Sequence, residues 1–149
     1  MNQHQKLQNL IHFIEEELGA KINFFPWENI PDPECRWDLP IDGCVYLDED
    51  IPPEIDIYVN DMNGDVDLVI TCLIHEMGHI LCFDEVGNEH TELDAWEAAV
   101  LSLPQEYVPE CFVSIKETAL QWYDEIEEDD TETRWDIEQF KQFVSLCFT

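Results

Sequence analysis

Near the start of the chain, apolar residues recur every three or four positions, which is the spacing of one face of an α-helix. The residues on this face are Leu7, Leu10, Ile11, Ile14 and Leu18. Gly19 follows directly and is suited to ending a helix, because glycine adopts left-handed backbone conformations at little cost. The pattern therefore predicts an amphipathic first helix that ends near Gly19.

Three short runs of β-compatible residues follow the first helix. They are Ile22–Phe24, Cys44–Leu47 and Ile55–Val59. The second and third runs are predicted to pair as antiparallel strands, across a connection that contains Pro52 and Pro53 and is longer than a tight hairpin. The dipeptide Asp42-Gly43 predicts a turn before the second run.

The rest of the chain has mostly helical patterns. An apolar stretch predicts a helix over Val66–Phe83, and a cap-like Thr91 predicts a further helix that ends near Leu103. Two more helices are predicted at about 109–126 and 135–148, with the acidic run 124–132 interpreted as a solvated linker. Strands followed by helices predict an α+β fold, and the length suits one domain that spans residues 1–149.

The chain is strongly acidic, because 35 Asp and Glu residues against 6 Lys and Arg residues give a net charge of −29. Phosphate backbones and anionic membranes repel such a surface, so direct nucleic-acid binding is not expected, whereas basic partners are attracted. No continuous apolar run approaches membrane-spanning length, and no signal peptide is evident. Scattered cysteines without a C-x-x-C pair favour reduced thiols in the cytoplasm.

The segment His75-Glu76-Met77-Gly78-His79 matches the H-E-x-x-H pattern. Residues four apart share one face of a helix, so both imidazoles can direct a nitrogen at the same metal ion. Glu76 flanks that position without having to bind the ion, which suits a general base that deprotonates a metal-activated water. Gly78 leaves space beside the second imidazole.

A catalytic zinc ion takes three protein ligands and keeps a fourth position for water, so His75 and His79 need a partner. Glu92 would reach the site from the next helix after a short reversal of the chain. The other candidates are His90, Asp84, Glu85, Cys72 and Cys82. A site that included either cysteine would be closed and structural rather than catalytic.

The motif and the downstream segment Glu92-Leu93-Asp94-Ala95-Trp96 resemble the ImmA/IrrE-type metallopeptidases. That family pairs H-E-[LIFM]-G-H with a helix of the form E-A-D-x-[FW]. The strand Ile55–Asn60 also resembles the segment before the family's motif helix, so the likeness covers about residues 55–103. It implies a zincin-like, gluzincin-related fold, in which a small, mostly antiparallel sheet packs on the active-site helix and further helices follow.

The resemblance also implies roles for individual residues. His75, His79 and Glu92 would bind one Zn²⁺ ion, Glu76 would be the general base, and Asp94 would orient a ligand. A zinc-dependent peptidase is therefore predicted, acting on a protein or peptide that the charge favours as basic. His90 is the preferred donor to the tetrahedral oxyanion, ahead of three tyrosines: Tyr58, Tyr107 and Tyr123. The alternative is a non-catalytic, metal-binding acidic protein that acts as an inhibitor or adaptor of a basic partner.

Overall fold

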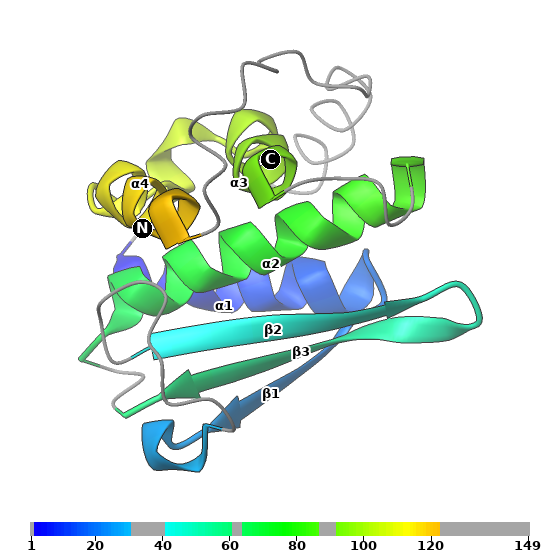
Figure 1. Cartoon of the computed structure of the whole chain (residues 1–149). Coiled ribbons are helices and arrows are strands. Elements are labelled where there is room, and N and C mark those ends of the chain that lie inside the picture. Colours follow the sequence, from blue (N-terminus) through cyan, green and yellow to red (C-terminus); the bar gives the residue numbers. More distant parts are fainter. Residues whose placement is uncertain (1, 31–40, 61–63, 87–91, 123–149) are drawn as a thin grey trace.

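A three-stranded sheet and four α-helices make up the part of the chain that the computed structural model describes, residues 2–30, 41–60, 64–86 and 92–122 (Figure 1). The elements are α1 (Gln3–Glu16), β1 (Lys21–Phe25), η1 (Trp27–Asn29), β2 (Ile41–Asp48), β3 (Ile51–Val59), α2 (Val66–Val86), α3 (Glu92–Ser102), η3 (Gln105–Tyr107) and α4 (Phe112–Trp122). The sheet is one layer, α1 and α2 cover one of its faces, and α3 and α4 lie on the other side of α2. The predicted α+β class is confirmed. The predicted acidic linker and last helix lie outside the described residues.

The first helix follows its sequence pattern closely. Asn2 and Gln5 form a capping box at its start, since each side chain accepts a hydrogen bond from the other residue's backbone N–H. Three of the five predicted face residues, Leu7, Leu10 and Ile14, are buried, and the other two are partly buried. Gly19 has a φ of 68°, so the chain turns there in the conformation that glycine favours.

The strands have the order β1-β3-β2, with β2 antiparallel and β1 parallel to β3. The predicted antiparallel pair is confirmed, but the expectation of a mostly antiparallel sheet is wrong because one of the two pairings is parallel. The last of the described strands in sequence, β3, is the middle one in space. Its residues Ile55, Ile57 and Val59 are buried, so the middle strand contributes a continuous row of side chains to the core.

The hairpin between β2 and β3 is tighter than predicted, since only Glu49 and Asp50 separate the two strands. Pro52 and Pro53, which suggested a loop, lie inside β3. Proline has no N–H to donate and is tolerated where a strand lacks a neighbour on one side. This condition holds here, because β1 pairs with β3 only from Glu54 onward.

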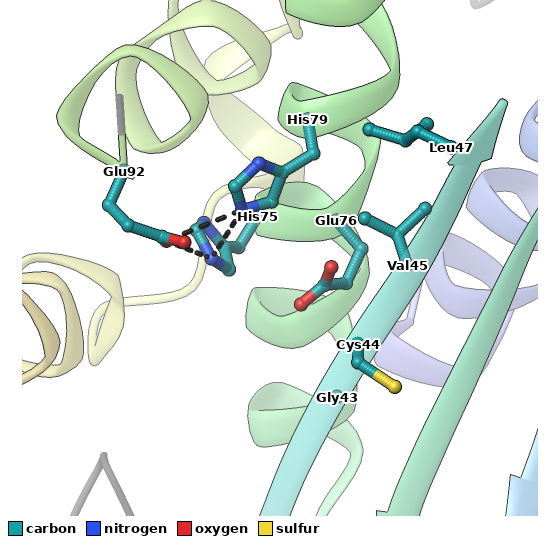
Figure 2. Close-up of a pocket in the computed structure, with 8 residues that line it drawn as sticks. All are labelled: Gly43, Cys44, Val45, Leu47, His75, Glu76, His79 and Glu92. Carbon is teal, nitrogen blue, oxygen red and sulfur yellow. Dashed lines mark hydrogen bonds and ion pairs between the residues drawn. The ribbon is translucent and has the colours of Figure 1, made fainter. Parts of the chain in front are cut away.

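Gly43 lies inside β2 and not in the predicted turn before it. The strand runs directly beside α2 (Figure 2). A Cβ atom on Gly43 would lie 2.6 Å from the sulfur of Cys72 on α2 and 3.0 Å from the Ile57 side chain. The glycine is therefore required for close packing of β2 and α2 and not for a reversal of the chain.

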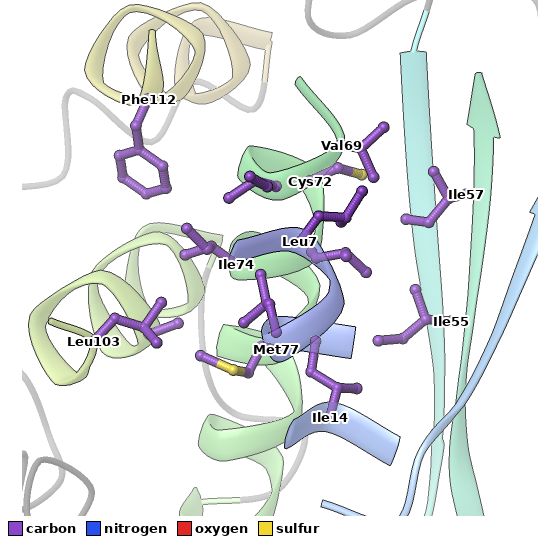
Figure 3. Close-up of a cluster of buried hydrophobic side chains, with 14 of the residues drawn as sticks. Leu7, Ile14, Ile55, Ile57, Val69, Cys72, Ile74, Met77, Leu103 and Phe112 are labelled. Atoms are coloured by element: carbon purple, nitrogen blue, oxygen red, sulfur yellow. The ribbon is translucent and has the colours of Figure 1, made fainter. Parts of the chain in front are cut away.

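Most of the described side chains of α2 are buried, on more than one side of the helix, which explains why its sequence is apolar without a strong one-sided pattern. Figure 3 shows Ile55 and Ile57 of β3 on one side of it, and Leu103 and Phe112 on the other. An 18-residue stretch, Val66–Phe83, is long and apolar enough to cross a membrane, but 78% of that stretch is buried inside the protein. Its apolar character is thus accounted for by its place in the core.

The two helices beyond α2 also lie within their predicted ranges over the described residues. Trp96 of α3 and Leu103, the residue just after α3, are buried. On α4, Phe112, Ile115 and Ala119 are buried against the core. The part of the predicted fourth helix beyond residue 122 lies outside the described chain.

Candidate metal centre

The side chains of His75, His79 and Glu92 meet at one point between α2 and α3 (Figure 2). Glu92 Oε2 lies 3.1 Å from His75 Nε2 and 3.3 Å from His79 Nε2, and the two Nε2 atoms are 3.2 Å apart. A tetrahedral site with metal–ligand bonds of 2.0–2.1 Å has edges of about 3.3 Å between its ligand atoms. The three atoms therefore have the spacing of three corners of a zinc-sized tetrahedron.

The path of the backbone explains how Glu92 reaches the two imidazoles. His75 and His79 are one turn apart on α2, and Glu92 is the first residue of α3. A Cβ on Gly78 would lie 1.8 Å from the carbonyl oxygen of Ala95 on α3. The sequence analysis expected Gly78 to leave space beside the second imidazole. In the structure the α3 backbone fills this space, and its close approach brings Glu92 to the site.

The charge state of Glu92 suits a metal ligand. Burial by itself raises the pKa of this carboxyl, but hydrogen bonds and charge from His75 and His79 outweigh burial and hold the pKa well below its usual value. A metal ion likewise binds the deprotonated form of a carboxylate and favours it.

A stack of aromatic rings holds the first imidazole in place. The His75 ring lies parallel to the Trp96 indole, with centroids 4.1 Å apart and planes at 19°, and Phe112 meets the indole edge-on at 5.4 Å. Trp96 is fully buried. Because the stack restricts rotation of the His75 ring, its Nε2 atom stays directed at Glu92 and His79.

Glu76 lies beside the three ligand atoms, in the wall of a cavity of about 230 Å³. Its side chain is 2% exposed and is directed toward the space between the imidazoles and β2 (Figure 2). The opposite wall is β2, which contributes Gly43, Cys44, Val45 and Leu47. The predicted base and ligands therefore share one cleft, bounded by the motif helix on one side and a strand on the other.

The wall from β2 is a part of the site that the sequence did not indicate. Its alternating residues Val45 and Leu47 were recognised as strand-forming, but alternation does not show which element a strand will pack against. Gly43 was the available signal. A glycine inside a strand pattern often marks the close approach of another backbone or element, and here that element is α2.

Of the other candidate ligands, the two cysteines, Cys72 and Cys82, have described side chains. Among the described residues, the group with ligand atoms within 4.8 Å of one another contains the two histidines and Glu92, and neither cysteine. The Cys72 sulfur lies against Gly43 of the sheet. Asp84 and Glu85 are in the last turn of α2, so the sharp reversal that they would need does not occur at that point. His90 lies outside the described residues.

The remaining predicted site residues have mixed outcomes. Asp94 is buried in the first turn of α3, close in sequence to Glu92, and its orienting role stays a prediction. Tyr107 is buried and its hydroxyl accepts a hydrogen bond from Asn9, at 3.1 Å, away from the cleft. Tyr58 projects from the face of β3 opposite the buried Ile57. Neither tyrosine lines the described cavity, and Tyr123 lies outside the described chain.

Comparisons with models of known protein families, with curated proteins and with solved structures gave no match for this chain. The resemblance to the ImmA/IrrE-type metallopeptidases therefore stays a prediction from short motifs. The candidate metal centre rests on its own geometry.

Proposed function

We propose that the protein is a zinc-dependent peptidase with a zincin-like active site. The observation that carries the proposal is the spacing of the three ligand atoms, between 3.1 and 3.3 Å, with the buried Glu76 beside them. Two imidazoles, one carboxylate and an open fourth position make up the ligand set of catalytic zinc in several peptidases. A structural zinc site would instead be closed by a fourth protein ligand, usually a cysteine.

The chain's own residues have distinct tasks in the proposed reaction. His75, His79 and Glu92 would hold a Zn²⁺ ion, which, when bound, acts as a Lewis acid toward water and the peptide carbonyl. Glu76 takes a proton from the attacking water and later delivers it to the leaving amine nitrogen. Trp96 keeps the His75 ring in the orientation that ligation needs.

The strand beside the cleft supports a peptide as the substrate. β2 is at the edge of the sheet, and in the described part of the chain β3 is its one strand neighbour. The side of an edge strand that lacks a neighbour can pair with an extended peptide through main-chain hydrogen bonds. A segment paired with β2 over Cys44–Leu47 would run along the cleft wall, past Glu76 and the ligand atoms.

The proposal is tested by comparing the wild type with Glu76→Gln on a mixture of peptides from a digested proteome, with cleavage read by mass spectrometry. Both proteins are expected to bind about one zinc ion per chain, and removal of the base is expected to lower cleavage by at least about 10²-fold. Glu106→Gln, an exposed residue on η3, is the matched control and should cleave as the wild type does.

Two results would count against this function. Equal cleavage by the wild type and Glu76→Gln would show that Glu76 is not the base. Zinc binding without cleavage by any preparation would favour the alternative, a metal-binding adaptor or inhibitor of a basic partner. In that case neutralising surface carboxylates, and not Glu76→Gln, would abolish partner binding, and added salt would weaken it.

A further inference from the structure

β2 has one face toward the metal cleft and one face toward the far side of the sheet. Successive residues of the strand point alternately to these two faces. Val45 and Leu47 point toward the motif helix, whereas the Cys44 sulfur points away from the imidazoles (Figure 2). Tyr46 shares the face of Cys44, since its hydroxyl lies 3.5 Å from that sulfur. A segment that paired with β2 would likewise direct alternate side chains to the cleft and to the far side.

The far side of the sheet, which we call the outer face, is acidic and aromatic. On β3, Ile55 and Ile57 are buried toward the helices, so the residues that alternate with them project from the outer face. Register places Tyr46 opposite Glu54 and Cys44 opposite Asp56. The outer-face residues used below are Asn23, Cys44, Tyr46, Glu54, Asp56 and Tyr58.

Two carboxylates are held together on the outer face next to an exposed ring. The Asn23 amide donates to Glu54 Oε1 at 3.0 Å and to Asp56 Oδ1 at 2.9 Å. Lys21 Nζ lies 3.8 Å from Glu54 Oε1. Tyr46, beside them, is 52% exposed. A carboxylate pair beside an accessible phenol ring suits a Lys or Arg side chain, which is attracted to both.

The two faces of β2 differ in the polarity of the side chains that a substrate would contact. Burial raises the pKa of the Cys44 thiol, and the negative charges of Glu76, Asp56 and Asp42 raise it further, while its hydrogen bond with Tyr46 lowers it. Carboxylates thus act on β2 from the cleft and from the outer face. The side chains that β2 itself directs into the cleft, Val45 and Leu47, are apolar, whereas Tyr46 on its outer face is aromatic and exposed.

We propose that the cleft selects extended segments in which apolar side chains alternate with Lys or Arg. This proposal rests on the proposed peptidase function and names its substrate class. In a segment paired with β2, one set of side chains meets Val45 and Leu47 and the other set crosses Tyr46. Strands are about 4.8 Å apart, so Glu54 and Asp56 on β3 are about 10 Å from the added strand, a gap that a lysine and a carboxylate side chain span together. The net charge of −29 attracts such a segment from solution.

The test uses fluorophore-quencher peptides of equal length with the zinc-loaded full chain. One core alternates Val and Lys, a second has the same residues in two blocks, and two others alternate Val with Gln or with Glu. The kcat/KM of the alternating Lys peptide is expected to be about tenfold higher than that of the block and Gln peptides. Its ratio to the kcat/KM of the Glu peptide is expected to be larger than tenfold. A tenfold effect agrees with the small energy of each exposed charge pair. About 0.5 M salt should remove most of this preference.

Variants assign the preference to the outer face. Asp56→Asn with Glu54→Gln keeps the shape and the Asn23 hydrogen bonding while removing two charges. It is expected to lower kcat/KM about tenfold for the alternating Lys peptide and to leave the Gln peptide within about twofold. Glu106→Gln with Glu117→Gln removes two exposed charges on η3 and α4 and is the matched control, with no change expected.

Peptide binding to zinc-loaded Glu76→Gln, measured by fluorescence anisotropy, separates recognition from cleavage. Cleavage of every pattern at similar rates, or an unchanged Lys preference in Asp56→Asn with Glu54→Gln, would overturn the substrate class and leave the peptidase function standing. Selective binding of the alternating Lys peptide without cleavage by the wild type would support the recognition surface and overturn the peptidase function. Absence of both cleavage and selective binding would overturn both.

Discussion

Among single residues, Gly78 has the strongest steric constraint that the described glycines show. A Cβ atom there would lie 1.8 Å from the Ala95 oxygen and 2.7 Å from its carbonyl carbon. Both are backbone atoms of α3, so no side-chain rotation can relieve the overlap. The residue between the two histidines therefore controls the distance of the helix that carries Glu92.

Gly78→Ala is expected to destabilise the fold by about 3 kcal/mol or more and to weaken zinc binding, because α3 must move away and take Glu92 with it. Urea unfolding measures the first effect and zinc titration the second. Ser114→Ala, at an exposed position of α4, is the control and should change stability by less than about 0.5 kcal/mol. Wild-type stability and zinc affinity in Gly78→Ala would contradict the close approach of the two helices.

The candidate site was predictable to the extent that its residues lie on one helix. The spacing of His75, Glu76 and His79 fixes their relative positions, because helix geometry is regular. Glu92 follows after a connection of variable path, so it was one of several candidates until the family resemblance singled it out. Leu47 was missed as a wall of the cleft, since its position depends on strand order, which local patterns do not encode.

At the scale of elements, close packing of β2 on α2 depends on complementary shapes at Gly43 and Cys72. Gly43→Ala is expected to destabilise the protein by about 1–3 kcal/mol, because the new methyl group would overlap the Cys72 sulfur. Here the obstacle is a side chain, unlike at Gly78. Removing the sulfur by Cys72→Ala should therefore restore part of the lost stability.

The test is a double-mutant cycle measured by chemical unfolding. The free energies of unfolding of Gly43→Ala, Cys72→Ala and the double variant are expected to be non-additive, with the double variant more stable than the sum of the single effects predicts by about 1 kcal/mol. Strict additivity would mean that the two residues do not touch.

Element types were easier to predict than their arrangement. The first helix has a strong one-sided pattern and the motif helix has a long apolar stretch, and both were predicted near their observed positions. Asp42-Gly43 and Pro52-Pro53 were interpreted as turn and loop because these residue types usually occur there. In the fold, Gly43 is required by the neighbouring helix, and Pro52 lies where β3 has one neighbour, so tertiary context decided both cases.

At the scale of the whole molecule, the candidate metal centre joins two parts of the chain. Two ligands come from α2 and the third from α3, so an ion bound by all three links the sheet-packed helix to the C-terminal helices. Because the unfolded chain does not hold the three ligands together, binding stabilises the folded state.

Zinc at about 100 times its dissociation constant is expected to stabilise the fold by about 2.7 kcal/mol, which corresponds to a rise in Tm of roughly 5–10 °C for a chain of this size. Calorimetry with zinc, and again after a chelator, measures the shift. His75→Ala should retain a cooperative transition that no longer responds to zinc. An identical response of the wild type and His75→Ala would place the ion elsewhere.

The two-sided burial of α2 also bears on how the protein is made. A ribosome releases the chain from the N-terminus, so α1 and the sheet are available before α3 and α4 have been synthesised. During that interval one flank of α2 can pack, while the flank that later meets Trp96 and Phe112 has nothing to cover it. The nascent chain therefore passes through a stage in which a long apolar helix is exposed and prone to aggregation. We expect chaperones that hold unfolded chains to act at this stage.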